Sequence, residues 1–341
     1  MRSDQLYISQ IAAIDPTTYF LKKYALDQQR FYDHLQLHQF TPDNPSSYLP
    51  TQLIHKGLLF LKYRMDVEHP GLEVGKSFDF KHWFYAYDLL NSHSALELIN
   101  LGNFFNNRLL TNFYTSHLLW DNNHPTIVWQ VKEFHEAARE YMLAAMMIYI
   151  NAIYNLTNAA DSIIKISLPV PYSPCIENYL SDYPVNDIVY GAPSAAIQLN
   201  QDALLKPLDS STLKEQLKSI PQRNTAHSIC PLPIQNVDDQ LFKLINSMLL
   251  QEVPDLQTIA DFSGMHLRTL QRRLKECGCT FSNIFDRVRY QKAEELLGND
   301  EIKITDIAFE LGYNDSAHFS RAFKRWSGLS PKQFRQKRLH A

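Results

Sequence analysis

The sequence predicts two domains: an α+β domain over residues 1–208 and an all-α domain over residues 238–341. The length of 341 residues favours two domains, because single cores seldom grow beyond about 250–300 residues. In the first part, stretches with helical periodicity alternate with stretches rich in aromatic and β-branched residues. In the second part, short helical segments follow one another, and five of the ten glycines of the chain lie in or between them.

The elements of the first part can be placed from periodicity and turn-forming residues. A helix is expected to start at Asp15-Pro16, because proline suits the first helical turn. Two further helices are expected over Thr51–Met65 and over Ala137–Tyr154, of which the second is apolar enough to be a buried core helix. Strands are expected at residues 112–120, 126–131, 163–170 and 195–199, the first two as a hairpin around a turn at 121–125.

Residues 209–237 are predicted to be a linker, since they are rich in Ser, Pro, Gln and Asn and lack sustained periodicity. The charge changes sign on either side of them. The whole chain carries a net charge of −3, but residues 238–341 hold 16 Lys and Arg against 14 Asp and Glu. From Ser316 to the end there are seven basic residues and no acidic one. Such local basic clusters favour binding to phosphate groups.

Nothing in the sequence predicts export or membrane insertion. The N-terminus lacks an apolar run behind a basic start, and the longest apolar stretch, Met142–Tyr154, is too short to cross a bilayer. The four cysteines show no disulfide framework and no Cys-x-x-Cys spacing; they are Cys175, Cys230, Cys277 and Cys279. A cytoplasmic protein with no membrane partner is therefore expected.

Two segments of the second part repeat one pattern. Residues 259–265 and 307–313 both read Ile-Ala, three residues, Gly and an apolar residue. Each is followed by a segment, 270–275 or 319–324, in which apolar residues four apart form one helical face. A support helix, a tight turn that favours glycine and a second amphipathic helix make a helix-turn-helix. The sequence thus predicts two helix-turn-helix units in tandem.

The second helix of such a unit enters the major groove of DNA, so it needs hydrogen-bond donors on its outer face. Arg272 and Arg321 occupy the same place in the two repeats, two residues after the first apolar position. An arginine can donate both arms of its fork to guanine, and a glutamine such as Gln271 can pair with adenine. The alternative is that these arginines are solvated charges or contact phosphate only.

Residues 238–341 resemble the DNA-binding domain of the AraC/XylS family of bacterial transcription regulators. The resemblance rests on Ile307-Ala308, Leu311-Gly312-Tyr313, Ser316, Phe319-Ser320-Arg321-Ala322-Phe323-Lys324, Gly328, Ser330-Pro331 and Phe334-Arg335. It implies two helix-turn-helix subdomains joined by a long helix, for which Phe281–Leu297 has the length and periodicity. Pro331 is expected to start a final helix.

The resemblance also implies which residues face DNA. Base-facing positions fall on Arg268, Gln271 and Arg272 in the first unit and on Ser316, Ala317, Ser320 and Arg321 in the second. Ala317 departs from the pattern, since it can touch a thymine methyl group but cannot hydrogen-bond a base. The predicted DNA-binding set is completed by Arg273, Lys324, Arg325 and Arg335. In the final helix, Lys332, Arg335, Lys337 and Arg338 are candidates for phosphate contacts, or else form a solvated basic end.

A weaker resemblance extends into the first 208 residues. Residues 70–75, 80–90, 95–99, 179–185 and 204–208 are similar to the N-terminal domain of the ornithine-utilisation-regulator and VirS-like branch of the family. This resemblance implies an arabinose-binding-type domain that binds a small-molecule effector, whose identity it leaves open. The partners it implies are double-stranded promoter or operator DNA, the effector, RNA polymerase and a second copy of the chain as a homodimer.

No catalytic residue, metal ligand or cofactor is expected. The sequence has no glycine-rich phosphate loop and no Gly-x-Ser-x-Gly turn. His34 and His38 have a metal-binding spacing but lack a third ligand nearby, and His135-Glu136 lacks the second histidine of a zinc protease. The aromatic residues Trp83, Phe84, Tyr85, Tyr87, Phe104 and Phe105 either line an apolar ligand pocket or form plain core.

Two other classes of protein are alternatives to a regulator. The runner-up is a DNA-repair methyltransferase with an AraC-like helix-turn-helix, whose chemistry needs a reactive cysteine cluster bound to zinc. The Cys-x-Cys pair beside Gly278 is a poor match to that requirement. The third is a small-molecule enzyme fused to a DNA-binding domain, against which the missing catalytic pattern counts. The sequence leaves the effector, the operator and the choice between activation and repression open.

Overall fold

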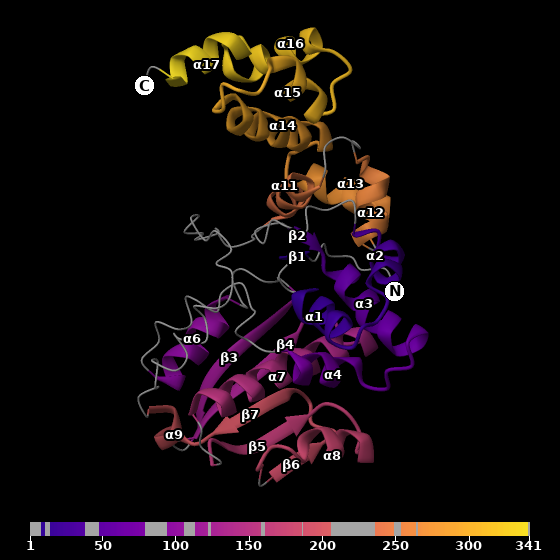
Figure 1. Cartoon of the computed structure of the whole chain (residues 1–341), viewed down its shortest axis with the longest axis vertical. Coiled ribbons are helices and arrows are strands. Elements are labelled where there is room, and N and C mark those ends of the chain that lie inside the picture. The colour runs from indigo at the N-terminus through magenta and orange to yellow at the C-terminus, as the bar shows by residue number, and fades with distance from the viewer. Residues whose placement is uncertain are drawn as a thin grey trace.

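The computed structural model describes eleven ranges, which are residues 8–10, 14–37, 48–78, 94–105, 113–121, 124–157, 161–185, 187–205, 236–248, 254–263 and 265–339. Figure 1 shows them as an elongated molecule, with a sheet and its helices at one end and a column of helices at the other. The α+β part and the all-α part predicted from the sequence are therefore both present. Of the helices in these ranges, none combines the length and apolar character that a membrane span requires.

A five-stranded sheet forms the base of the N-terminal part. Its strands are β3 (Tyr114–Asp121), β4 (His124–Val131), β5 (Ile163–Leu168), β6 (Asp187–Tyr190) and β7 (Ala195–Leu199). They follow the order β3-β4-β7-β5-β6, and all neighbours are antiparallel except β5 and β6. The predicted hairpin is confirmed, with Asp121 opposite His124. A separate two-stranded sheet pairs β1 (Ile8–Gln10) with β2 (Tyr48–Pro50).

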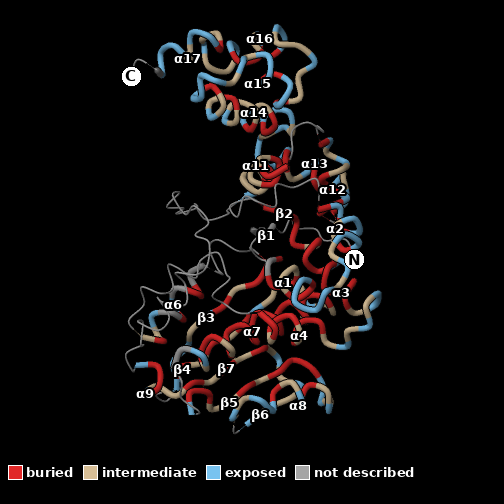
Figure 2. The backbone as a smooth tube through the Cα atoms, in the orientation of Figure 1, coloured by how far each residue is buried: buried red, intermediate tan, exposed pale blue. Residues whose placement is uncertain are grey.

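The helix α7 (Glu136–Thr157) is the centre of the N-terminal core. Residues 141–150 are all buried, as expected for a helix that is apolar around its whole circumference. It contacts β4 and β7 on one side and α3 and α4 on another, and Figure 2 shows its middle as continuously buried. The surrounding helices are α1 (Asp15–Lys23), α2 (Gln28–Leu35), α3 (Thr51–Arg64), α4 (Pro70–Ser77), α6 (Ala95–Phe105), α8 (Pro174–Leu180) and α9 (Gln201–Leu205).

Helices α4 and α7 approach each other through two glycines one helical turn apart. The backbone amide of Gly71 donates to Oε2 of Glu140 on α7 at 3.0 Å. The Asn151 side-chain amide, also on α7, donates to the carbonyl of Gly75 at 3.0 Å. Glu140 is 1% exposed, and its other oxygen lies 3.9 Å from Nζ of Lys62. The contact therefore combines close backbone packing with a buried carboxylate.

The C-terminal part consists of helices in the order that the sequence predicts. They are α11 (Val237–Ser247), α12 (Leu256–Ser263), α13 (Leu267–Glu276), α14 (Phe281–Leu297), α15 (Ile304–Glu310), α16 (Ser316–Ser327) and α17 (Pro331–Leu339). The long connector is confirmed over the expected residues, and the final helix does start at Pro331. Gly312, in the turn after α15, has φ of 77°, which is the left-handed conformation expected there.

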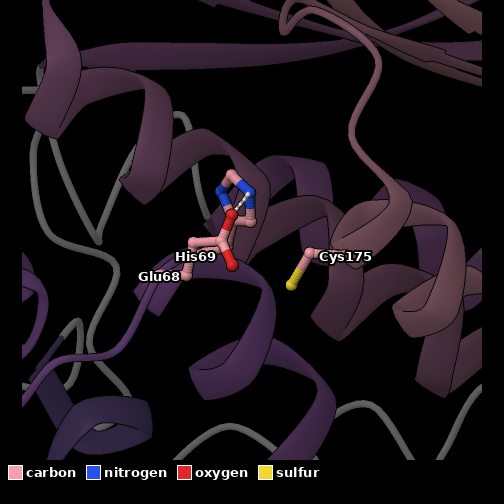
Figure 3. A group of neighbouring side chains, drawn as sticks. All are labelled: Glu68, His69 and Cys175. Atoms are coloured by element: carbon pink, nitrogen blue, oxygen red, sulfur yellow. Dashed lines mark ion pairs between the residues drawn. The ribbon is translucent and has the colours of Figure 1, made fainter.

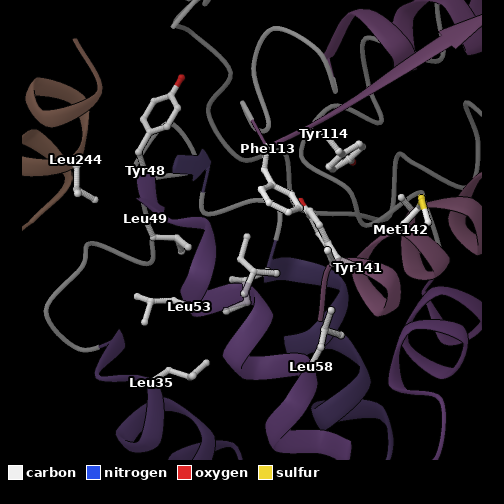
Figure 4. Packing of buried hydrophobic residues seen from close by; sticks show 14 of the residues in the cluster. Leu35, Tyr48, Leu49, Leu53, Leu58, Phe113, Tyr114, Tyr141, Met142 and Leu244 are labelled. Carbon is white, nitrogen blue, oxygen red and sulfur yellow. The ribbon is translucent and has the colours of Figure 1, made fainter. Parts of the chain in front are cut away.

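The two parts touch where β2 meets α11. The backbone amide of Tyr48 donates to Oγ of Ser247 at 2.6 Å, and both residues are buried. The Lys243 ammonium group lies 5.3 Å from the centre of the Tyr48 ring. Figure 4 shows Leu244 of α11 beside Tyr48 and Leu49, and α12 also contacts α3. We call this contact between β2 and α11 the seam.

Candidate nucleic-acid interface

The two predicted helix-turn-helix units are formed by α12 with α13 and by α15 with α16. In the second helix of each unit, the apolar pair turns inward. Leu270 and Leu274 are buried in α13, and Phe319 and Phe323 are buried in α16. The opposite faces of the two helices are thus left to polar side chains, which is the arrangement that the repeated pattern predicts.

The predicted base-facing residues of α13 lie on its outer face. Arg268, Gln271 and Arg272 are exposed, whereas Arg273 is half-buried. Nε of Arg272 lies 3.7 Å from Oε1 of Glu276, one turn further along, and both side chains are 64% exposed. An exposed ion pair of this kind contributes little, so it leaves the Arg272 guanidinium available to another acceptor.

The outer face of α16 carries the second predicted set. Ala317, Arg321 and Lys324 are exposed, and Ser316 and Ser320 are half-exposed. The helix begins after Asp315, whose carboxylate accepts from the backbone amide of His318 at 2.7 Å. This hydrogen bond lowers the pKa of Asp315, so the cap stays ionised at neutral pH. The cap fixes the direction in which α16 starts and hence where its outer face points.

Two predicted residues are engaged inside the domain. Arg325 donates to Asp286 of α14 at 2.8 Å, and Arg335 donates to the carbonyl of Ile302 at 2.8 Å. Arg325 is 67% exposed and can leave its partner, but the Arg335 side chain is half-buried. In α17, Arg338 donates to the carbonyl of Glu294, while Lys332 and Lys337 are exposed. The exposed lysines are therefore better placed for phosphate than the two arginines of α17.

Arg289 is a structural residue of the domain that the sequence pattern did not reveal. Its guanidinium lies 4.3 Å from the centre of the Phe285 ring and 4.5 Å from that of Tyr313. It also donates to the carbonyl of Gly312 at 3.4 Å. Burial lowers the pKa of Arg289 below its ordinary value. This arginine connects α14 to the turn of the second unit and is not offered to DNA.

The helix α14 connects the two units. It contacts α11, which precedes the first unit, and it contacts α15 and α16 of the second unit and the final helix α17. Its 17 residues span roughly 25 Å at about 1.5 Å per residue. Figure 1 shows α13 and α16 on either side of it.

The aromatic residues suggested for an effector pocket lie outside the described residues. This holds for Trp83, Phe84, Tyr85 and Tyr87 and for the side chains of Phe104 and Phe105, and also for His38 of the considered metal pair. His34 lies on α2 with its ring 4.7 Å from that of Phe60, as a packed aromatic side chain would.

Comparison with known proteins finds similarity within the second part of the chain. Residues 259–337 match the family described as a helix-turn-helix domain. The HTH-type transcriptional regulator VqsM of Pseudomonas aeruginosa is 38% identical over 96 residues, which is 28% of this chain and 30% of that protein. The HTH-type transcriptional activator RhaS of Klebsiella pneumoniae is 41% identical over 101 residues, which is 29% of this chain and 36% of that protein. The chain thus covers about a third of the length of these relatives.

Solved structures show a more distant likeness. The transcriptional regulator CdpR from Pseudomonas aeruginosa is 18% identical with a TM-score of 0.40, over 94% of this chain and 96% of that one. The C-terminal domain of AraT, a response regulator from Geobacillus stearothermophilus, is 31% identical with a TM-score of 0.28, over 31% of this chain and 88% of that one.

Proposed function

We propose that the chain is a sequence-specific DNA-binding transcription regulator of the AraC type, because residues 259–337 match a helix-turn-helix family and relatives over this region are named transcriptional regulators. The observation that carries the proposal is the repetition of one arrangement in α13 and α16. Each helix buries an apolar pair and exposes an arginine two residues after its first member, Arg272 or Arg321. A reader of bases needs this combination of a fixed inner face and a donor on the outer face.

The two arginines are expected to set sequence preference. Arg272→Ala and Arg321→Ala should each weaken binding to the preferred site by about 1–3 kcal/mol, because each removes a bidentate contact to guanine. The preferred site is first selected from random DNA with the full chain. Fluorescence anisotropy then gives the affinity of each variant for that site and for random DNA.

The matched control is Lys337→Ala, at an exposed position of α17. It is expected to reduce the slope of log affinity against log salt by about one unit and to leave the preference unchanged, because it removes one phosphate contact. If both arginine variants keep the original ratio of specific to random binding, Arg272 and Arg321 do not read bases.

We also propose that the N-terminal part binds a small-molecule effector and mediates homodimer formation. The seam supports control of this kind, because it joins a strand of the N-terminal part to the first helix of the DNA-binding part through buried groups.

The RhaS relatives are named activators, which favours activation through RNA polymerase. Such a regulator acts on DNA in the cytoplasm. Residues 1–208, 209–237 and 238–341 are the proposed effector domain, linker and DNA-binding domain.

An effector is expected to raise the melting temperature of the full chain, because a ligand that binds only the folded state stabilises it. The measurement is a thermal shift screen against a broad set of metabolites, with the Arg321→Ala variant as control. A true effector of the N-terminal part shifts both proteins equally. If no metabolite shifts the melting temperature and none changes the promoter response in cells, the N-terminal part is an interaction module and not a sensor.

A DNA-repair methyltransferase is the competing function. Its chemistry needs a reactive cysteine in a zinc-binding cluster. Among the described residues, Cys277 and Cys279 belong to no group of side chains that could hold a metal ion, and the group that could do so contains a single cysteine, Cys175, and no cysteine cluster. The regulator is therefore the function that the DNA-binding part supports best.

A further inference from the structure

Three side chains with metal-binding atoms converge where the segment before α4 meets the start of α8. They are Glu68, His69 and Cys175, and their ligand atoms all lie within 4.8 Å of one another. Figure 3 shows the Glu68 carboxylate next to the His69 ring, with the Cys175 side chain of α8 beside them. The cluster belongs to the N-terminal part and shares no residue with the proposed DNA-binding surface.

We propose that Glu68, His69 and Cys175 bind a divalent metal ion of the Zn²⁺ class. One imidazole nitrogen, one sulfur and one carboxylate oxygen make a mixed donor set that suits zinc, whereas magnesium and calcium prefer oxygen ligands alone. Bonds of about 2.0–2.3 Å place tetrahedral ligand atoms roughly 3.5 Å apart, so binding needs a contraction of about one ångström. The Glu68 side chain is 67% exposed and free to make that movement.

The His69 ring gives the strongest support. Both of its nitrogens are buried and have no hydrogen-bond partner among the described residues. A buried polar atom without a partner is costly, and native proteins seldom leave one. Nε2 lies 3.7 Å from Oε1 of Glu68, and Nδ1 lies 3.9 Å from Oε1 of the buried Glu140. A metal ion on Nε2, with a shift of the ring that brings Nδ1–H from 3.9 Å to hydrogen-bond distance of Glu140, satisfies both nitrogens.

This arrangement assigns Glu140 the role of a positioning residue. A histidine that binds a metal usually donates its second nitrogen to a carboxylate, which fixes the ring orientation and tautomer. Glu140 is itself held by the backbone amide of Gly71 at 3.0 Å, so the carboxylate is in place before a metal arrives.

The local charge favours a cation. Glu68, Glu73 and Glu140 all border the cluster region, and Glu73 accepts a hydrogen bond from Tyr179 of α8 at 2.5 Å. Lys62 lies 3.9 Å from Glu140 but only 2.9 Å from Glu136, so its charge is shared. A divalent ion compensates the remaining negative charge. It also joins the start of α4 to α8, two segments far apart in the sequence, and leaves its fourth position to solvent.

Cobalt(II) is a suitable probe, because it replaces zinc and its complexes with thiolates absorb strongly. Titration of the full chain with Co²⁺ is expected to give a sulfur-to-cobalt charge-transfer band that saturates at one ion per chain and disappears when Zn²⁺ is added. Cys175→Ser is expected to abolish the band. The matched control is Cys277→Ser, at an exposed cysteine of the DNA-binding part, which is expected to keep it. Absence of the band, or its survival in Cys175→Ser, overturns the proposal.

A measurement on the unmodified protein guards against misfolding of the variant. Zn²⁺ is expected to slow the alkylation of Cys175, followed by mass spectrometry, while Cys277 reacts at an unchanged rate. Equal rates for Cys175 with and without Zn²⁺ contradict the site. Glu140→Gln is expected to weaken zinc binding by about 10–100-fold, as removal of such a supporting carboxylate does elsewhere. All of these readouts are independent of DNA affinity, so the metal site and the proposed regulator can fail separately.

Discussion

Phe323→Ala is expected to unfold the second helix-turn-helix unit while the first unit keeps its fold. Phe323 is fully buried and is surrounded by aromatic rings, with centroid distances of 5.2 Å to Phe334, 5.7 Å to Tyr290 and 5.8 Å to Phe319. Truncation of a buried phenylalanine to alanine costs about 3–5 kcal/mol. That loss is a large part of the stability of a small unit.

Hydrogen exchange of the full chain measures this effect locally. Phe323→Ala is expected to lose amide protection in α15, α16 and α17 but to retain it in α12 and α13. The matched control is Phe309→Ala in the same unit, where the side chain is 58% exposed and its removal should change stability by less than about 0.5 kcal/mol. Loss of protection throughout the C-terminal part would instead mean that α14 couples the two units into one folding unit.

The same variant tests how DNA is read. If both units enter the major groove, the unmodified chain protects two short clusters of bases about 10 base pairs apart in an asymmetric site, because successive grooves on one face are about 34 Å apart. Phe323→Ala then keeps one cluster and loses the other. A single protected cluster in the unmodified chain, insensitive to the insertion of five base pairs beside it, would leave the second unit as an anchor on phosphate.

Gly71→Ala is expected to force α4 away from α7. A Cβ atom at this position would lie 2.0 Å from the carbonyl oxygen of Glu140 and 2.8 Å from its carbon, both of which are backbone atoms. Backbone cannot yield as a side-chain end can, and overpacking of this kind costs about 1–3 kcal/mol or more. The hydrogen bond that the Gly71 backbone amide donates to the Glu140 carboxylate would be strained at the same time. Chemical denaturation of the full chain, followed by far-ultraviolet circular dichroism, measures the loss.

Gly102→Ala in α6 is the matched control. There a Cβ atom would lie 2.7 Å from the Tyr149 hydroxyl, which is a side-chain atom and not backbone. The substitution also raises helix propensity by about 1 kcal/mol, which offsets part of the contact. The destabilisation should therefore be clearly smaller than for Gly71→Ala. Equal effects would show that the close backbone approach of α4 and α7 is not what makes Gly71 necessary.

The sequence was sufficient where one local pattern determines one element. The connector α14 has helical periodicity over its whole length, and its predicted bounds agree with those observed. The hairpin of β3 and β4 follows from a turn-forming cluster between two β-rich stretches, and α7 follows from an apolar run that only a buried helix accommodates. The repeated pattern likewise places Arg272 and Arg321 on outer faces, because helical spacing determines which side of a helix a residue occupies.

What the sequence did not reveal depends on residues brought together by the fold. The strand β6 has only four residues and pairs with β5 in parallel. No hairpin turn in the sequence therefore indicates that this strand is present. In the sequence Arg289 does not differ from the other basic residues, because its contacts with the rings of Phe285 and Tyr313 form only in the folded chain. His69 and Cys175 carry no metal-binding spacing, because α4 and α8 become neighbours only in the folded chain. Which nucleotides Arg272 and Arg321 select likewise depends on contacts with DNA, and the spacing of residues in the sequence does not predict these contacts.

The seam between Tyr48 and Ser247 has a thermodynamic consequence. If an effector changes the equilibrium between two arrangements of this contact, and DNA prefers one of them, then each ligand alters the affinity of the other by the same factor. The promoter would act on the effector site as strongly as the effector acts on the promoter. A regulator occupied at its operator would therefore respond to a different concentration of effector than the same molecule free in solution, so its sensitivity would belong to the complex and not to the protein alone.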